Sequence, residues 1–146
     1  MRRADLFAAI AAIAVSTTAW SASFDYQLKP QKVADGVYTL IGKTENFSRE
    51  NGGNIVNTGF IVGPEGVIVI DSGPSKAYGE QQRAAIAKLT PKPVVQLLLT
   101  HAHPDHVLGG QAYAGVPTAS LPATTASLTQ SGDALLGNLY RLVGDA

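Results

Sequence analysis

The order of apolar and polar positions predicts several short β-strands in the first half of the chain. The segment "FDYQLK" (24–29) alternates apolar and polar residues, which is typical of a half-buried strand. Asp35-Gly36 is typical of a tight turn, and a second strand is expected directly after it at 37–41. Two further strands are expected within "NIVNTGFIVG" (54–63) and "GVIVID" (66–71).

A loop and a helix are expected around these strands. The polar, glycine-ended segment 43–53 is interpreted as a loop. Further along, "EQQRAAIAKL" (80–89) has helical propensity, and Ala85, Ile86 and Leu89 can form an apolar face on it. The following "TPKP" is expected to end this helix, because proline cannot continue it.

The next apolar run is nearly continuous. "VVQLLL" (94–99) predicts a strand that is buried on both faces, since a strand with one solvated face would alternate. A short strand is expected within 116–120. The last segment, 123–146, is predicted to be helical with a break near Gly132.

Composition limits the classes of partner and site. A length of 146 residues favours one domain. The 11 basic and 11 acidic residues give zero net charge, so no basic face for nucleic acid is expected. The chain has no cysteine, which excludes disulfides, thiolate zinc ligands and a cysteine nucleophile within it.

The first residues predict export. Arg2 and Arg3 precede the short apolar run 6–15, and small and polar residues follow it, which is the pattern of a secretory signal peptide. We expect a signal peptide at 1–22 and a mature domain at 23–146, although cleavage after Ser21 and after Ser23 both fit. The predicted location is the bacterial periplasm or the exterior, without a stable membrane anchor after cleavage. An uncleaved anchoring helix is the alternative.

Candidate chemistry is concentrated directly behind the run 94–99. All three histidines lie in "THAHPDH", at positions 101, 103 and 106. If the backbone stays extended, His101 and His103 point to the same side. Pro104 keeps His103 out of helical geometry and suits the first position of a helix, which would begin with Asp105 and His106. Imidazole nitrogen and carboxylate oxygen suit zinc, and also iron or manganese. An incidental polar loop and adventitious metal binding are the alternatives.

"THAHPDH" (100–106) resembles the His-x-His-x-Asp-His signature of the metallo-β-lactamase-fold hydrolases. "VIVIDSG" (67–73) is similar to the strand ending in Asp-Ser/Thr-Gly that precedes this signature in the superfamily. The resemblance covers about residues 30–146. Within the superfamily, the chain looks most like the secreted zinc metallohydrolases associated with quinoprotein oxidation systems.

The resemblance implies a role for each matching residue. His101 and His103 would ligate a first zinc ion, and Asp105 and His106 a second. Asp105 would also act in catalysis. It would accept a proton from a metal-bound water, which becomes the hydroxide nucleophile, or hold that water in line for attack. Asp71 would support the metal loop from behind, although a strand-end aspartate that caps its own turn fits as well.

Two further features follow from the same resemblance. The loop 43–53 would be a flap over a small-molecule substrate with Phe47 at its tip, and a merely solvated loop is the alternative. The implied fold is α+β, the N-terminal αβ half of a four-layer αβ/βα sandwich.

The chain also departs from the family. It has no histidine after His106, whereas the superfamily completes its site with ligands from the second half of the fold. We therefore expect a truncated hydrolase that is inactive alone and self-associates through an exposed half-sandwich face. A non-catalytic half-domain that binds metal or a partner protein is the alternative.

Overall fold

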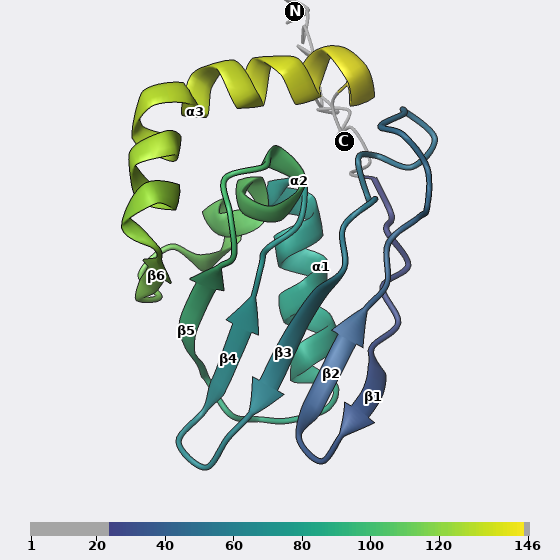
Figure 1. Ribbon diagram of the computed structural model, residues 1–146. Helices are drawn as coiled ribbons and strands as arrows, with labels where there is room; N and C mark the ends of the chain where they lie inside the picture. Colours follow the sequence, from purple (N-terminus) through teal and green to yellow (C-terminus); the bar gives the residue numbers. More distant parts are fainter. Residues whose placement is uncertain (1–23, 145–146) are drawn as a thin grey trace, which may run out of the picture.

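The computed structural model describes residues 24–144, which form one six-stranded sheet with helices packed against it (Figure 1). The strands lie in the sheet in their sequence order. They are β1 (Gln31–Ala34), β2 (Val37–Leu40), β3 (Thr58–Val62), β4 (Val67–Ile70), β5 (Val94–Leu99) and β6 (Thr118–Ser120). The expected signal peptide, residues 1–22, lies outside the described residues.

The sheet is mixed. Strands β1 to β4 pair antiparallel, through short turns between β1 and β2 and between β3 and β4 and through the long segment 41–57 between β2 and β3. Strand β5 runs parallel to both β4 and β6. Parallel neighbours need a crossover connection, and helix α1 (Lys76–Ala87) supplies the one between β4 and β5. Helix α2 (Pro104–Val107) and the 3₁₀ helix η1 (Leu108–Tyr113) supply the next. The predicted α+β class is therefore confirmed.

The core lies between the sheet and the layer made by α1 and η1. It consists of Phe60, Val67, Val69 and Leu97 from the strands, Ile86 from α1 and Tyr113 from η1. Successive strand residues point to opposite faces, so these strand side chains mark the covered face of the sheet. Their burial fixes where the ends of β4 and β5 lie relative to the helices.

The segment 24–29 is not a strand, which corrects the sequence interpretation. Its backbone bonds to a helix instead: Tyr26 N donates to Gln81 Oε1 at 2.8 Å, and Gln81 Nε2 donates to the Phe24 carbonyl at 2.6 Å. Gln27 has a φ of 49°, which interrupts extended geometry. The hairpin partner of β2 is therefore β1, on the other side of the Asp35-Gly36 turn.

The apolar run 94–99 does form a strand, but the prediction that both of its faces are buried is wrong. Leu97 is 1 % exposed, whereas Leu98, which points to the opposite face, is 36 % exposed. Within residues 24–144 the helical layer made by α1 and η1 covers the face of Leu97 only. The second apolar face of β5 is therefore left without a covering layer in the described part of the chain.

Two helices also differ from expectation. Helix α1 begins four residues earlier than predicted, because Ser75 caps it by accepting from Tyr78 N at 3.1 Å. Ala85 and Ile86 are buried on its apolar face, but Leu89 is 48 % exposed beyond its end. Helix α3 (Pro122–Val143) is continuous, so the expected break near Gly132 is wrong; the helix bends instead (Figure 1).

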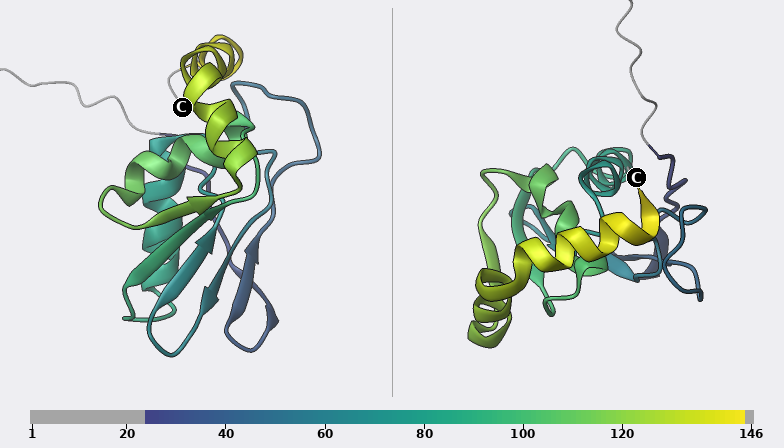
Figure 2. Two further views of the ribbon diagram at one scale, coloured as in Figure 1. Left: turned by 60° about the vertical axis from the view of Figure 1, so that its left-hand side comes forward. Right: turned by 90° about the horizontal axis from the view of Figure 1, so that it is seen from above.

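Helix α3 crosses the end of the sheet at which β5 terminates (Figures 1 and 2). Leu139 and Val143, near its C-terminal end, are buried and lie against the loop residue Gly53. None of the helices within residues 24–144 combines the length and the apolar character needed to cross a membrane.

Candidate metal centre

The three histidines lie at the carboxyl end of strand β5. The strand ends at Leu99, and α2 begins at Pro104, so four residues carry the chain from sheet to helix. His103 caps α2 with an extended backbone (φ −67°, ψ 143°), and Pro104 occupies the first helical turn. This is the backbone geometry that the sequence predicts.

The loop gathers its rings on one side. The ring centroids of His101 and His103 are 4.6 Å apart, and those of His101 and His106 are 4.0 Å apart. Asp105 is buried at the start of α2, and its Oδ2 lies 3.6 Å from His106 Nε2. All four side chains that were predicted as ligands therefore lie in one cluster.

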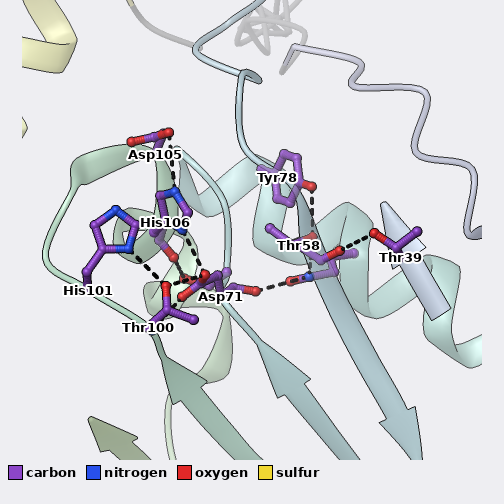
Figure 3. Close-up of polar contacts among 10 residues, drawn as sticks. Thr39, Thr58, Asp71, Tyr78, Thr100, His101, Asp105 and His106 are labelled. Carbon is purple, nitrogen blue, oxygen red and sulfur yellow. Dashed lines mark hydrogen bonds and ion pairs between the residues drawn. The ribbon is translucent and has the colours of Figure 1, made fainter. Parts of the chain in front are cut away.

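Asp71 lies behind this cluster, at the end of the neighbouring strand β4 (Figure 3). Its Oδ1 accepts a hydrogen bond from Thr100 N at 2.9 Å. Its Oδ2 accepts from Thr100 Oγ1 at 2.8 Å and lies 2.7 Å from His106 Nδ1. One buried carboxylate thus joins the backbone of the histidine loop to a histidine ring.

These contacts fix the tautomers of two rings. A carboxylate only accepts, so His106 carries its proton on Nδ1 and donates it to Asp71. The Thr100 hydroxyl donates its one hydrogen bond to the same carboxylate. Its oxygen therefore accepts the hydrogen bond from His101 Nδ1, at 2.9 Å. In the neutral form of each ring, Nε2 is then the nitrogen of His101 and of His106 that can bind a metal.

The ionisation states agree with this arrangement. Burial alone would raise the pKa of Asp71, but the hydrogen bonds from His106 and Thr100 outweigh it and hold that pKa below its ordinary 3.8. The pKa of His101 lies below its ordinary 6.5, because of partial burial and then the neighbouring His106 and His103. An ionised Asp71 beside a neutral His101 is the state that ligation by the ring requires.

Small residues let the backbone close behind the loop. Ser72 N and Ser72 Oγ donate to the His106 carbonyl at 2.8 and 3.1 Å. Gly109 N donates to the Gly73 carbonyl at 2.9 Å, and a Cβ on Gly109 would overlap the Ser72 carbonyl. The neighbouring Gly110 has more room, with nothing nearer than 3.8 Å to a Cβ there.

Phe47 has no such link to the cluster. It is half-buried in the loop 43–53, which Asn51 organises by accepting from Ser48 N and Gly53 N. None of the hydrogen bonds or ring contacts found among residues 24–144 joins Phe47 to the histidine loop. Its role as the tip of a substrate flap stays a prediction.

Sequence reasoning missed Thr100. Its hydroxyl connects Asp71 to His101, and its backbone N–H holds the carboxylate from the other side. The available signal was a hydroxyl residue placed directly between the end of an apolar strand and the first histidine.

The donor set fits zinc in its chemistry. Zinc binds imidazole nitrogen and carboxylate oxygen, and a ligating histidine usually donates its other ring N–H to a carboxylate, as His106 does to Asp71. Within residues 24–144, however, no three acidic or histidine side chains converge on one point. The side chains approach one another two at a time, with His101 near both His103 and His106, and Asp105 near His106.

Comparison with known protein sequences gives two likenesses. Residues 51–124, half of the chain, match the sequence model of the Metallo-beta-lactamase superfamily. A linear primary-alkylsulfatase from Pseudomonas sp. is 38% identical over 53 residues, which are 36% of this chain and 10% of that protein.

Solved structures give the same picture for the fold. A metallo-β-lactamase from Hirschia baltica has a TM-score of 0.60 at 24% identity, over 72% of this chain and 48% of that one. The metallo-β-lactamase FIM-1 from Pseudomonas aeruginosa, in a mono-zinc form, has 0.60 at 21% identity, over 72% and 46%. The chain has the fold of these proteins and spans about half of their length.

Proposed function

Because the chain belongs to the metallo-β-lactamase superfamily, we propose that it carries the metal-binding part of a zinc-dependent hydrolase that acts on a small molecule. The observation that carries this proposal is the cluster of histidine rings, in which the Nδ1 atoms of His101 and His106 are both engaged in hydrogen bonds. Thr100 accepts the hydrogen bond from His101 Nδ1, and Asp71 accepts the one from His106 Nδ1. The Nε2 atom of each neutral ring is then the nitrogen that can bind a metal.

Each predicted ligand has a role in this proposal. His101 and His103 would hold one zinc ion, and Asp105 and His106 a second. When bound, zinc lowers the pKa of a water ligand and polarises a carbonyl or phosphoryl oxygen of a substrate. Asp105, buried beside His106, would take the proton of the attacking water or orient it. The same donors accept iron or manganese.

Asp71 would act without touching metal or substrate. Its carboxylate holds the ring of His106 by one hydrogen bond and the loop backbone by another. Such outer partners fix the orientation of a ligand and raise its basicity.

The site is incomplete within these residues. A catalytic zinc ion usually has three protein ligands and an open position, whereas each ion here would receive two. The chain spans about half the length of the structures that it matches. We propose that ligands outside this chain complete the centre, so that the chain alone binds zinc weakly and turns over no substrate.

Metal binding by the full chain tests the proposal. His101→Ala and His106→Ala are each expected to weaken zinc binding by at least about tenfold, since even the loss of an outer partner costs about 10–100-fold. Phe47→Ala is the matched control and is expected to bind zinc as the parent does. Titration calorimetry and elemental analysis measure both. Unchanged zinc binding in the two histidine variants would show that the loop is not the site.

We further propose that the protein is exported to the periplasm or secreted, because residues 1–22 have the pattern of a signal peptide. N-terminal sequencing of protein from a periplasmic extract is expected to find a start between Ala22 and Phe24. Intact Met1 in a cytosolic fraction would contradict export.

A second candidate function is a non-catalytic half-domain that binds metal or a partner protein. The partly exposed apolar face of β5 favours it, since exposed apolar patches commonly mark interaction surfaces. The two candidates differ in turnover when the zinc site is completed. Hydrolysis by the chain together with a protein segment that supplies further metal ligands would favour the hydrolase, and zinc binding without hydrolysis in the same assay would favour the binding module.

A further inference from the structure

A buried polar cluster lies between helix α1 and the sheet, directly behind Asp71. At its centre is Gln82 of α1, which is 0 % exposed. It is surrounded by hydroxyl groups of Thr58 on β3, Tyr78 on α1 and Tyr113 on η1. A buried amide is costly unless its groups are hydrogen-bonded, so the partners of Gln82 decide what it does there.

The amide of Gln82 uses both of its donor hydrogens. Its Nε2 donates to Thr58 Oγ1 at 2.9 Å and to the Asp71 carbonyl at 3.2 Å. Its Oε1 accepts from the Tyr113 hydroxyl at 2.7 Å. Burial raises the pKa of Tyr78 to about 12 and also raises that of Tyr113, so both phenols keep their protons. The cluster therefore carries no charge, and the Gln82 amide and the Tyr113 hydroxyl both donate hydrogen bonds within it.

The hydrogen bond from Gln82 to the Asp71 carbonyl is made to a residue with an unusual backbone conformation. Asp71 has a φ of 57°, in the left-handed region that non-glycine residues seldom adopt. The peptide unit that follows it is held on both sides. Gln82 binds its carbonyl, and its N–H, on Ser72, donates to the His106 carbonyl at 2.8 Å.

This conformation decides where the carboxylate points. From it, Asp71 reaches Thr100 N, Thr100 Oγ1 and His106 Nδ1 together. A relaxation of Asp71 toward ordinary strand geometry would rotate its peptide away from Gln82 and turn the carboxylate away from the ring. Strained backbone persists only when its surroundings hold it, and Gln82 supplies a side-chain contact that does so.

We propose that Gln82 is a positioning residue, which holds Asp71 in its left-handed conformation and thereby keeps His106, and through Thr100 also His101, in the Nδ1-protonated tautomer. The use of this arrangement for metal binding rests on the proposed function. The positioning itself does not, because it exists in the chain without a metal.

The test follows the histidine rings of the metal-free, tag-free full chain by ¹⁵N NMR. The chain has three histidines, so three ring systems appear, and the exposed His103 is an internal reference. In the parent, His106 is expected to show one Nδ1-protonated tautomer with a slowly exchanging proton.

Gln82→Met keeps the volume of the side chain but removes its donors. The Nδ1 proton of His106 is then expected to exchange up to about tenfold faster, and both tautomers of the ring are expected to appear, because the hydrogen bond that holds the Asp71 carbonyl is lost. Tyr113→Phe is the matched control, since it removes a bond to Gln82 Oε1 but leaves the bond to Asp71. Its His106 signals are expected to match those of the parent.

The outcomes separate positioning from plain stability. Parent-like tautomer and exchange at His106 in Gln82→Met, with a loss of stability like that of Tyr113→Phe, would overturn the proposal. If Gln82→Met does not fold, Gln82→Glu replaces it, because it keeps the shape and the acceptor for Tyr113. Exchange at His106 must then be faster than in the parent, and unchanged exchange would overturn the proposal as well. Failure of zinc binding with intact His106 signals would count against the proposed function alone.

Discussion

At the scale of single residues, the organisation of the site depends on one carboxylate. Asp71 is 2 % exposed and contacts the loop through Thr100 and His106. Its position could be predicted, because an acidic residue that ends an apolar strand needs partners when it is buried. Thr100 could have been noticed from its place between the apolar strand and the first histidine. Gln82 could not be singled out, since a helical amide gives no pattern until the fold places it beside Asp71.

Asp71→Asn is expected to destabilise the folded chain by about 1–3 kcal/mol at neutral pH, because buried donors would lose a charged acceptor. The pKa of Asp71 is lowered in the folded state, so its contribution to stability is present above the ordinary value of 3.8. The contribution is lost as the pH falls below 3.8 toward the lowered pKa. The difference between parent and variant in the free energy of unfolding should therefore shrink there, as measured by urea unfolding at several pH values.

Asp35→Asn is the control for this prediction. Asp35 is fully exposed and pairs with Lys32 at 2.7 Å, and exposed pairs contribute only about 0–1 kcal/mol. Asparagine also suits the turn before Gly36. Equal destabilisation by both substitutions, or a cost of Asp71→Asn that is the same at every pH, would refute the role given to the carboxylate.

At the scale of elements, the sequence predicted those helices, strands and loops whose conformation depends on residues close together in the chain. The bounds of β5 match the run 94–99, because a segment with five apolar residues among six can hardly be placed elsewhere than in the sheet. The loop geometry at Pro104 was predictable for a similar reason, since proline restricts its own backbone and that of His103.

The misassigned elements have causes distant in sequence. The segment 24–29 alternates like a strand, but the side chain of Gln81, more than fifty residues away, binds its backbone. The α+β class and the position of the histidine loop could thus be predicted from the sequence. The convergence of Asp71, Thr100 and Gln82 could not, because it depends on the packing of α1 against the sheet.

At the scale of the whole molecule, the sheet has a helical layer on one face only within residues 24–144. The strand register places Ile61 beside Ile68 and Ile70 beside Leu98, each in the position that alternates with core residues. These four side chains lie on the face opposite to the core, and none of them is fully buried. All-parallel sheets are normally covered on both faces, and β4, β5 and β6 pair in parallel in this part of the sheet.

We expect the chain by itself to associate with a second copy through this face. Leu98→Lys should weaken the association by at least about tenfold, because it places an unpaired charge in an apolar contact, and the cost of burying such a charge exceeds the ~1.4 kcal/mol that corresponds to a factor of ten. Leu89→Lys is the matched control, since Leu89 is 48 % exposed beyond the end of α1, on the helical side. Sedimentation over a range of concentrations should show an oligomeric parent and control and a more dissociated Leu98→Lys. If the parent stays monomeric at every concentration, this face is in contact with solvent in the isolated chain. The prediction of self-association would then be wrong.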